Sequence, residues 1–370
     1  ATNGTLTISA GNTTATFNVA VLADTLAEAN ETVTLTISSA SNATISDATA
    51  TLTITDDDAT PSLSIADVSG NETAGNRQFT VTLSAASGQD VTVNYATSNG
   101  TATAGADYTA TSGSLTIAAG ATTATFNVGV LADSIDEANE TATLTLSGVS
   151  STATISDATA TLTITDDDNP PSVDFNATSS NGAESASSKA LTVDLSAASG
   201  LDVAVAYTLS GTATGSGTDY TLANGTLTIS AGETSGTITI GSIINDTLDE
   251  ANETVIVTLT ASPTNASLGS DDAHTYTIND NDDPPLLDIS SSNVAIDDVT
   301  TTDESAANSV FIITLSAASG LAVSFDYATS NGTATAGADY TAVSGTVTIA
   351  AGSTTGTIAV PVLADSLDEA

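Results

Sequence analysis

The chain has no cysteine, methionine or tryptophan, and its 370 residues include only two basic side chains, Arg77 and Lys189. Without cysteine, neither disulfides nor thiolate metal sites can form. The 44 acidic residues bring the formal charge to -42, which excludes the basic surface that nucleic acids and anionic membranes require. No apolar run is long enough to cross a bilayer as a helix. We therefore expect cations as the partners of this chain.

Aromatic residues are also scarce, with six Phe and seven Tyr, so the core must be small and aliphatic. Threonine is abundant and alternates with apolar residues at a period of two, which is typical of half-buried strands. In residues 59–168 this alternation predicts about seven strands, and the pattern predicts an all-β fold of tandem immunoglobulin-like sandwiches. The predicted strands are marked by Leu63 and Ile65, Phe79 to Leu83, Val91 to Tyr95, Leu115 and Ile117, Ala124 to Val130, Leu144 and Leu146, and Leu162 and Ile164.

An acidic stretch of eight residues recurs along the chain. Asp133 to Glu140 has counterparts at Asp24 to Glu31, at Asp246 to Glu253 and, in part, at Asp365 to Ala370. Their first residues lie 109, 113 and 119 residues apart, which is too long for solenoid repeats. Each interval should therefore be a domain with its own core.

Prolines follow the acidic triplet that closes each interval, and they predict short, stiff junctions in an extended rod. The predicted units are a C-terminal half (1–58), two complete units (59–168 and 169–283) and the N-terminal part of another (284–370). We favour an excerpt of a longer repetitive polypeptide. The second hypothesis is filament self-assembly, in which the strands after Pro284 are completed by those before Asp58 of an identical chain.

Eight of the twelve acids in residues 59–168 lie in four short segments at predicted strand ends. Loops at one end of a sandwich converge, so these carboxylates can share a small volume. Two carboxylates about 4 Å apart repel by roughly 4 kcal/mol at an effective dielectric near 20. A hard cation with six to eight oxygen ligands relieves this repulsion, and Ca²⁺ fits better than Mg²⁺ or Zn²⁺. The alternative is a solvated acidic surface with acidic linkers.

The segments that close on Asp107-Tyr108, run from Leu115 to Gly120, run from Asp133 to Glu140 and end at Asp166 to Asp168 look like those of Calx-beta domains. That family is known from sodium–calcium exchangers, integrin β subunits and large bacterial surface proteins. The resemblance implies calcium ligands in the second unit at Glu72, Asp107, Asp133, Glu137, Glu140, Asp166, Asp167 and Asp168, with the carbonyl of Ile135.

The same resemblance extends to the other units. In the third it implies Glu184, Asp219, Asp246, Glu250, Glu253, Asp280 and Asp282, with Asn281 in place of the middle acid of the closing triplet. The first half carries Asp24, Glu28, Glu31, Asp56, Asp57 and Asp58, and the fourth carries Glu304, Asp339, Asp365 and Glu369.

The function implied is a calcium-binding structural segment of a secreted or cell-surface adhesin, fibre or matrix protein, with Ca²⁺ stiffening the domain junctions. The alternative is a regulatory calcium sensor that transmits binding to a partner. An enzyme such as a glycosidase is not expected, because the paired carboxylates are the only feature of the sequence that would support catalysis. His274, the only histidine, is expected at a surface or edge position. Sequons at Asn30, Asn139 and Asn252 lie inside the acidic stretches, which argues against their glycosylation.

Overall fold

The computed structural model describes residues 3–260, 262–287 and 308–364 of the chain. Regular structure in these ranges is β apart from one 3₁₀ turn, η1 (Glu72–Ala74). The chain divides into two compact units, Ala1–Asn169 and Pro170–Ala370. Within the described ranges, none of the helical structure has the length and apolarity to cross a membrane.

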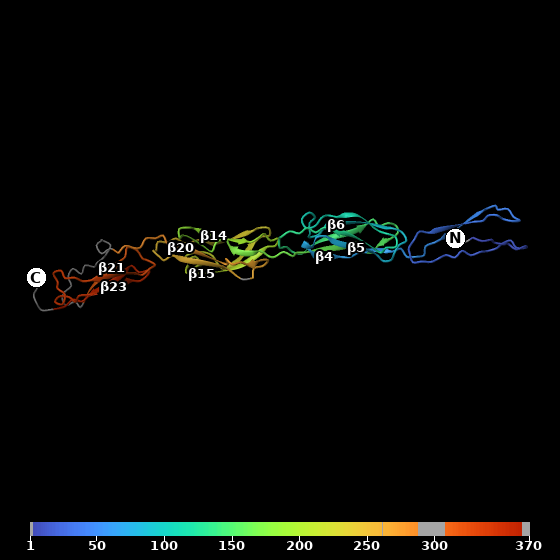
Figure 1. Ribbon diagram of the computed structural model, residues 1–370. Helices are drawn as coiled ribbons and strands as arrows, with labels where there is room; N and C mark the ends of the chain where they lie inside the picture. The colour runs from blue at the N-terminus through green and yellow to red at the C-terminus, as the bar shows by residue number, and fades with distance from the viewer. Residues whose placement is uncertain (1–2, 261, 288–307, 365–370) are drawn as a thin grey trace. The chain divides into compact units, whose positions relative to one another are not determined.

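Residues 59–168 fold into two sheets that face each other (Figure 1). The strands are β3 (Ser62–Ile65), β4 (Val68–Asn71), β5 (Arg77–Leu83), β6 (Val91–Asn99), β7 (Ser112–Ile117), β8 (Thr123–Val128), β9 (Glu140–Ser147), β10 (Thr154–Ile155) and β11 (Thr159–Thr165). One sheet has the order β10-β3-β5-β8 and the other β4-β11-β9-β6-β7. All seven predicted strands are present, and the prediction of an all-β sandwich is confirmed.

Two further strands, β4 and β10, are not predicted by the sequence pattern. β10 has only two residues and pairs parallel with β3, while β4 has the sequence Val-Ser-Gly-Asn and pairs parallel with β11. Both lie at the edge of their sheets, and each is too short and has too few apolar residues to show the alternation that marks the other strands. β4 matters for the site, since it leads directly into η1 and so positions Glu72.

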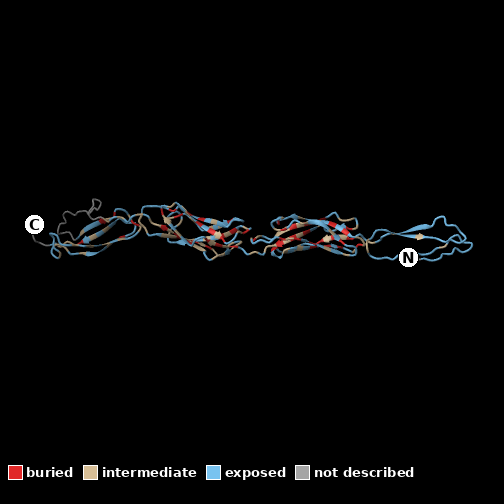
Figure 2. Ribbon diagram, turned by 45° about the horizontal axis from the view of Figure 1, so that its top comes forward, coloured by how far each residue is buried: buried red, intermediate tan, exposed pale blue. Residues whose placement is uncertain are grey.

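The alternation of side chains along the strands builds the core (Figure 2). In β5, Phe79, Val81 and Leu83 are buried while the threonines between them are exposed. Phe126 of β8 stacks on the ring of Tyr95, with 3.9 Å between centroids. Each buried aliphatic or aromatic side chain contributes about 1.5–3 kcal/mol relative to exposure, so this small core still supplies the main stabilisation of the repeat.

Residues 170–283 repeat the same topology. The strands are β12 (Ser172–Phe175), β13 (Ser179–Ala183), β14 (Ser188–Leu195), β15 (Val203–Gly211), β16 (Gly225–Ile229), β17 (Ser235–Gly241), β18 (Glu253–Leu259), β19 (Ser267–Leu268) and β20 (Ala273–Asn279). They form sheets of order β17-β14-β12-β19 and β13-β20-β18-β15-β16.

The surface or edge position expected for His274 is wrong. His274 lies on β20, between β13 and β18, and is only 4% exposed. Its Nε2 lies 2.7 Å from Ser180 Oγ, and its ring lies 5.6 Å from that of Phe175. Both ring nitrogens have a partner, since Nδ1 also lies 2.5 Å from the carbonyl of Ala177. The histidine is therefore a core residue whose polar atoms are satisfied.

The two outer segments contain fewer strands within their described residues. Residues 3–58 contain the antiparallel pair β1 (Glu31–Thr36) and β2 (Thr49–Ile54). Residues 308–364 contain two antiparallel pairs, which are β21 (Ser309–Thr314) with β24 (Thr355–Val360) and β22 (Val323–Ala328) with β23 (Ser344–Ile349).

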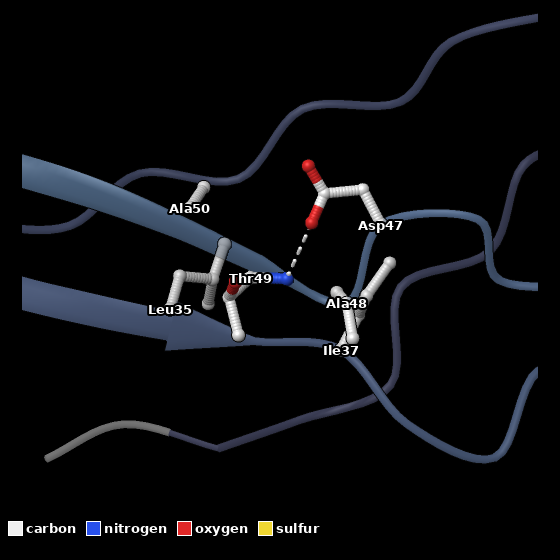
Figure 3. A pocket seen from close by; sticks show the side chains of 6 residues that line it. All are labelled: Leu35, Ile37, Asp47, Ala48, Thr49 and Ala50. Carbon is white, nitrogen blue, oxygen red and sulfur yellow. Dashed lines mark hydrogen bonds between the residues drawn. The ribbon is translucent and has the colours of Figure 1, made fainter.

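Apolar side chains remain open to solvent in residues 3–58, as the pale colour of this segment in Figure 2 shows. Ile8 and Phe17 are 54% and 50% exposed, whereas their counterparts Ile117 and Phe126 are buried. A hollow of about 160 Å³ lies at the end of the β1–β2 hairpin and is lined by Leu35, Ile37, Asp47, Ala48, Thr49 and Ala50 (Figure 3). Its one polar anchor is Asp47 Oδ1, which accepts a hydrogen bond of 3.2 Å from Thr49 N.

Candidate metal centre

Three carboxylates of the second repeat meet at one end of the sandwich. Glu72 stands on η1 directly after β4, Asp133 lies in the connection from β8 to β9, and Asp168 follows β11. One oxygen of each lies within 4.8 Å of the other two. We call these three residues the first triad. It joins segments that are about 60 and 35 residues apart in the sequence, as loop convergence at the end of a sandwich predicts.

A second triad lies in the same repeat. Asp107 comes from the β6–β7 connection, Glu137 from the β8–β9 connection and Glu140 from the first position of β9, and one oxygen of each lies within 4.8 Å of the others. The β8–β9 connection therefore supplies a ligand to the first triad and another to the second.

Backbone amides hold the acidic loops in place. Asp133 Oδ1 accepts a hydrogen bond of 2.7 Å from Ile135 N, and Asp107 Oδ2 accepts one of 2.6 Å from Thr103 N. The carbonyl of Asp107 also accepts one of 2.9 Å from Leu131 N, which ties the β6–β7 connection to the start of the acidic stretch. Such side-chain turns fix the direction of each carboxylate.

An asparagine fastens the acidic stretch to the closing triplet. Asn139 Oδ1 accepts a hydrogen bond of 3.1 Å from Asp166 N, and Asp166 Oδ1 accepts one of 3.2 Å from Glu137 N. The same bond recurs as Asn30 to Asp56 N at 3.1 Å and as Asn252 to Asp280 N at 3.0 Å. The sequence pattern marks these asparagines only as sequons, although their fixed place in the three complete acidic stretches is a signal of this role.

The triads carry carboxylates that are costly to ionise. Glu72 is 8% exposed, and its Oε1, like Asp168 Oδ2, is buried without a hydrogen-bond partner among the described residues. Burial, followed by the carboxylates of Asp168 and Asp133, raises the pKa of Glu72 to about 7. In the second triad, burial and then the charge of Asp107 raise the pKa of Glu140 to about 7. Such groups need either a proton or a cation.

The pKa values of Glu137 and Asp166 are also raised, in both cases first by burial. For Glu137 the charges of Asp133 and Asp107 add to that effect. For Asp166 the hydrogen bond from Glu137 N acts in the opposite direction. The carboxylates of the two triads thus share one electrostatic environment.

Asp167 does not join either triad. It is exposed, and its Oδ2 accepts hydrogen bonds from Thr73 Oγ1 and, at 3.4 Å, from Asn71 Nδ2. These bonds anchor the closing triplet to the β4–η1 segment that carries Glu72. For Ile135, another implied ligand, the structure gives an amide that bonds Asp133 but no role for the carbonyl.

The third repeat contains the counterpart of the first triad. One oxygen each of Glu184, Asp246 and Asp282 lies within 4.8 Å of the others. Burial, followed by Asp282, raises the pKa of Glu184 to about 7, and Asp280 Oδ1 and Asp282 Oδ2 are buried without a hydrogen-bond partner among the described residues. Asn281 takes the anchoring place of Asp167, since its Oδ1 accepts a hydrogen bond of 3.3 Å from Ser185 N.

The counterpart of the second triad is looser in the third repeat. Asp219, Glu250 and Glu253 do not form a trio within 4.8 Å, as judged on the described residues. They remain close, because burial and then Asp219 raise the pKa of Glu253 to about 7. The turn that carries Asp219 closes on Thr214 N, five residues away, whereas that of Asp107 closes over four. The turn before Asp219 is therefore one residue longer than its counterpart in the second repeat.

In the outer segments the predicted ligands are only partly gathered. Glu28 is exposed, and partial desolvation, followed by the charges of Asp24, Glu31, Asp56 and Asp58, raises its pKa; desolvation and then Asp56 and Asp57 raise the pKa of Asp58. Asp339 makes the same turn as Asp107, accepting a hydrogen bond of 2.6 Å from Thr335 N. The predicted ligands that lie outside the described residues are Glu304, Asp365 and Glu369.

Acids outside the triads have local structural roles. Asp67 Oδ1 accepts a hydrogen bond from Thr161 N at 2.7 Å, Asp90 Oδ1 from Ala119 N at 2.9 Å and Asp157 Oδ1 from Thr159 N at 3.3 Å. These carboxylates satisfy backbone donors at strand ends, so the chain uses its acids in two distinct ways.

The donor sets of the triads contain oxygen only, and their charge has no basic side chain to balance it. Arg77, the nearest cation in the sequence, donates instead to the carbonyl of Asn71. Hard divalent cations with flexible coordination suit such sets, whereas Zn²⁺ and Cu²⁺ prefer nitrogen and sulfur ligands. Orphaned carboxylate oxygens together with raised pKa values therefore fit Ca²⁺.

Comparisons with known proteins identify similar chains among the solved structures. The CBD12 fragment of CALX1.2 matches 59% of this chain over 99% of its own length, at 21% identity and a TM-score of 0.30. The apo form of the Calx CBD1 domain matches 30% of this chain over its full length, at 24% identity and a TM-score of 0.29. None of the curated proteins compared with the chain matches it. The Calx-beta domain model matches residues 1–58, 59–168, 166–282 and 280–370, so the chain belongs to the Calx-beta family.

Proposed function

We propose that this chain is a calcium-binding structural segment of a secreted or cell-surface protein, an adhesin, fibre or matrix component in which Ca²⁺ stiffens an extended array of repeats. The observation that carries the proposal is the set of carboxylate oxygens that are buried without a hydrogen-bond partner among the described residues, on Glu72 and Asp168 in the second repeat and on Asp280 and Asp282 in the third. Burying a carboxylate oxygen without a partner is costly, and a cation at this place removes the cost.

Ca²⁺ would be held by the first triad through Glu72, Asp133 and Asp168, and by the second through Asp107, Glu137 and Glu140. In the third repeat, Glu184, Asp246 and Asp282 would hold it. The ion supplies positive charge that cross-links loops, and the chain's own residues orient the ligands through backbone amides and Asn139. Because the unfolded chain lacks such sites, binding energy adds to the free energy of unfolding.

A secreted location is part of this proposal, and the affinities of extracellular calcium modules would suit it. Extracellular calcium modules bind at roughly 10⁻⁴ to 10⁻³ M, which matches free calcium outside cells and not inside. The absence of cysteine is compatible with this location, since calcium takes the stabilising role that disulfides have in many secreted domains.

A calcium titration of the full chain tests the proposal, with Asp168→Asn and Asp167→Asn as a matched pair. Both variants remove one charge from neighbouring positions, and the amide oxygen introduced by Asp167→Asn would still accept hydrogen bonds from Thr73 and Asn71. We expect Asp168→Asn to lower calcium affinity by about 10-fold or more, because a ligand with an unpartnered oxygen is lost. Asp167→Asn should change it little.

Calorimetric titration with Ca²⁺ and then Mg²⁺ provides the measurement. Equal affinities in the two variants would indicate diffuse binding to a charged surface and would contradict the proposal. A calcium-dependent change in partner binding, without a change in stiffness, would favour the alternative function of a regulatory sensor.

A further inference from the structure

A neutral pentapeptide, Ser-Ala-Ala-Ser-Gly, occurs at residues 84–88, 196–200 and 316–320, at the same place in each repeat. It connects the third and fourth strands of the repeat, β5 to β6 in residues 59–168. The triads do not use it, and the alternation of the strands does not require it. We call it the SAASG loop.

The SAASG loop of the fourth repeat touches the acidic stretch of the third. Ser319 is 1% exposed, and its Oγ donates a hydrogen bond to the carbonyl of Asp249 at 3.2 Å and lies 3.1 Å from Asp249 Oδ2. Gly320 N donates to the same carbonyl at 3.0 Å. Asp249 is the third residue after Asp246, so the contact falls in the middle of the acidic stretch.

The SAASG loop of the second repeat makes the equivalent contact with the first. Gly88 N donates to the carbonyl of Ala27 at 3.0 Å, and Ser87 Oγ donates to it at 3.4 Å. Ala27 is the third residue after Asp24, as Asp249 is after Asp246. The acceptor is a backbone carbonyl in both cases, so the contact tolerates the change from alanine to aspartate.

The glycine of the loop is needed for close approach and not for its backbone conformation. A Cβ on Gly320 would lie 2.6 Å from Glu250 Cγ, and one on Gly88 would lie 2.5 Å from Glu28 Cγ. Neither glycine has a φ in the left-handed region, so alanine would be unstrained there apart from this collision. Glu250 and Glu28 are predicted ligands, and the glycine therefore packs on a residue of the candidate metal centre.

We propose that the SAASG loop is the docking surface that seats one repeat on the acidic stretch of the repeat before it, and that docking and calcium binding strengthen each other. The loop is neutral and turns N–H and O–H donors toward the acidic stretch, so it can approach a stretch whose carboxylates would repel an acidic partner. A bound cation would hold the stretch, and with it the accepting carbonyl, in one conformation. Docking in turn would fix Glu250, and linkage requires both effects to have the same magnitude.

This inference rests on the proposed function, and a distance measurement can separate the two. The chain has no cysteine, so Thr228→Cys and Thr357→Cys, both exposed, introduce a single pair of spin labels in the third and fourth repeats. Pulsed electron paramagnetic resonance on the full chain then gives the distance distribution with added Ca²⁺ and with chelator. We expect a narrow distribution in Ca²⁺ and a broad one in chelator.

Gly320→Ala is the decisive variant, and Gly332→Ala is its control, because a Cβ at Gly332 meets no atom within 4 Å. Gly320→Ala should lose the calcium-dependent narrowing and should lower the calcium affinity of the third repeat, while Gly332→Ala should match the parent. If Ca²⁺ binds but Gly320→Ala behaves like Gly332→Ala, the docking inference is wrong and the proposed function stands. If the full chain does not bind Ca²⁺ at all, the proposed function is wrong, and the coupling of docking to calcium binding is wrong with it.

Discussion

At the scale of single residues, the candidate metal centre is built from carboxyls whose negative charge is unfavourable where they lie. Glu72, Glu140, Glu184 and Glu253 each have a pKa of about 7, in every case first because of burial. Near neutral pH, each of these carboxyls is poised between holding a proton and holding a cation. No lysine or arginine neutralises these carboxylates, because Arg77 and Lys189, the two basic residues of the chain, lie elsewhere.

The raised pKa values predict how stability depends on pH without calcium. A carboxyl with an ordinary pKa of 4.5 in the unfolded chain and about 7 in the folded one binds more protons when folded. Its contribution is therefore fully present below pH 4.5 and is lost as the pH rises from about 4.5 to 7. We expect the melting temperature in chelator to fall over this window. Added Ca²⁺ should remove the fall, because it replaces the proton.

Proton release gives an independent check of the same prediction. Calcium binding at pH 7 should release protons, so its calorimetric heat should vary with the ionisation enthalpy of the buffer. The double variant Glu72→Gln and Glu140→Gln should release fewer protons than the parent. A heat that does not depend on the buffer would show that these groups are already ionised.

At the scale of structural elements, the Asn139 bond to Asp166 N decides how the loops meet. It joins the β8–β9 connection to the end of β11, and its counterparts at Asn30 and Asn252 make the same bond. Removing an orienting group of this kind typically costs 10-fold to 100-fold in metal affinity. We expect Asn139→Ala to weaken calcium binding in the second repeat by about 10-fold and to leave the third unchanged.

Isothermal titration of Asn139→Ala, compared with Asn18→Ala at an exposed position, measures this effect. Asn139→Asp should weaken calcium binding less than Asn139→Ala does, because aspartate keeps an oxygen that accepts the hydrogen bond from Asp166 N. If all three variants bind calcium alike, Asn139 does not orient the site. A glycan on Asn139 would be attached to the amide nitrogen and would leave Oδ1 free to accept the hydrogen bond from Asp166 N. Whether the sequon is used can be measured by mass spectrometry of the protein produced in a glycosylating host.

Elements also show how far the sequence could be read. The alternation of apolar residues predicted seven strands of the second repeat, because each strand has one buried and one solvated face. The same alternation around Ile8 and Phe17 yields no strand, although Ile117 and Phe126 lie in β7 and β8. A strand needs a paired neighbour and a covered face, and in the described residues 3–58 neither is present for this segment. The alternation of apolar and polar residues therefore predicts that a segment can form a strand, but not that the strand is present.

The residue types of the candidate site could be predicted from the sequence, but which of the acids join a triad could not. Recurrence and the location of acids at strand ends are enough to group Glu72 and Asp133 with the triplet Asp166 to Asp168 from the sequence. Nothing in the triplet Asp166 to Asp168 distinguishes its members, yet Asp168 joins a triad and Asp167 bonds Asn71 and Thr73. The distinction depends on what lies opposite each residue, which includes the segment of β4 and η1 that carries Asn71 and Thr73, and β4 is a strand that the sequence did not reveal.

At the scale of the whole molecule, the repeats are not equivalent, and calcium should affect them to different degrees. Among the described residues, the second repeat has two triads within 4.8 Å and the third has one. A site that binds only the folded state adds about 2.7 kcal/mol when the ligand is at 100 times its Kd. With calcium in excess, the second repeat should therefore gain about twice the stabilisation of the third.

Scanning calorimetry of the full chain in chelator and in excess Ca²⁺ tests this difference, with Asp168→Asn and Asp282→Asn assigning each transition to its repeat. A second arm replaces Ca²⁺ by NaCl at equal ionic strength, because a chain of net charge -42 is also stabilised by simple screening. Screening should shift both repeats by similar amounts, since it acts on total charge and not on the triads. Unequal shifts in Ca²⁺ but equal shifts in NaCl would confirm that stabilisation follows the number of triads. Equal shifts in both salts would mean that the acids act only as a diffuse charge.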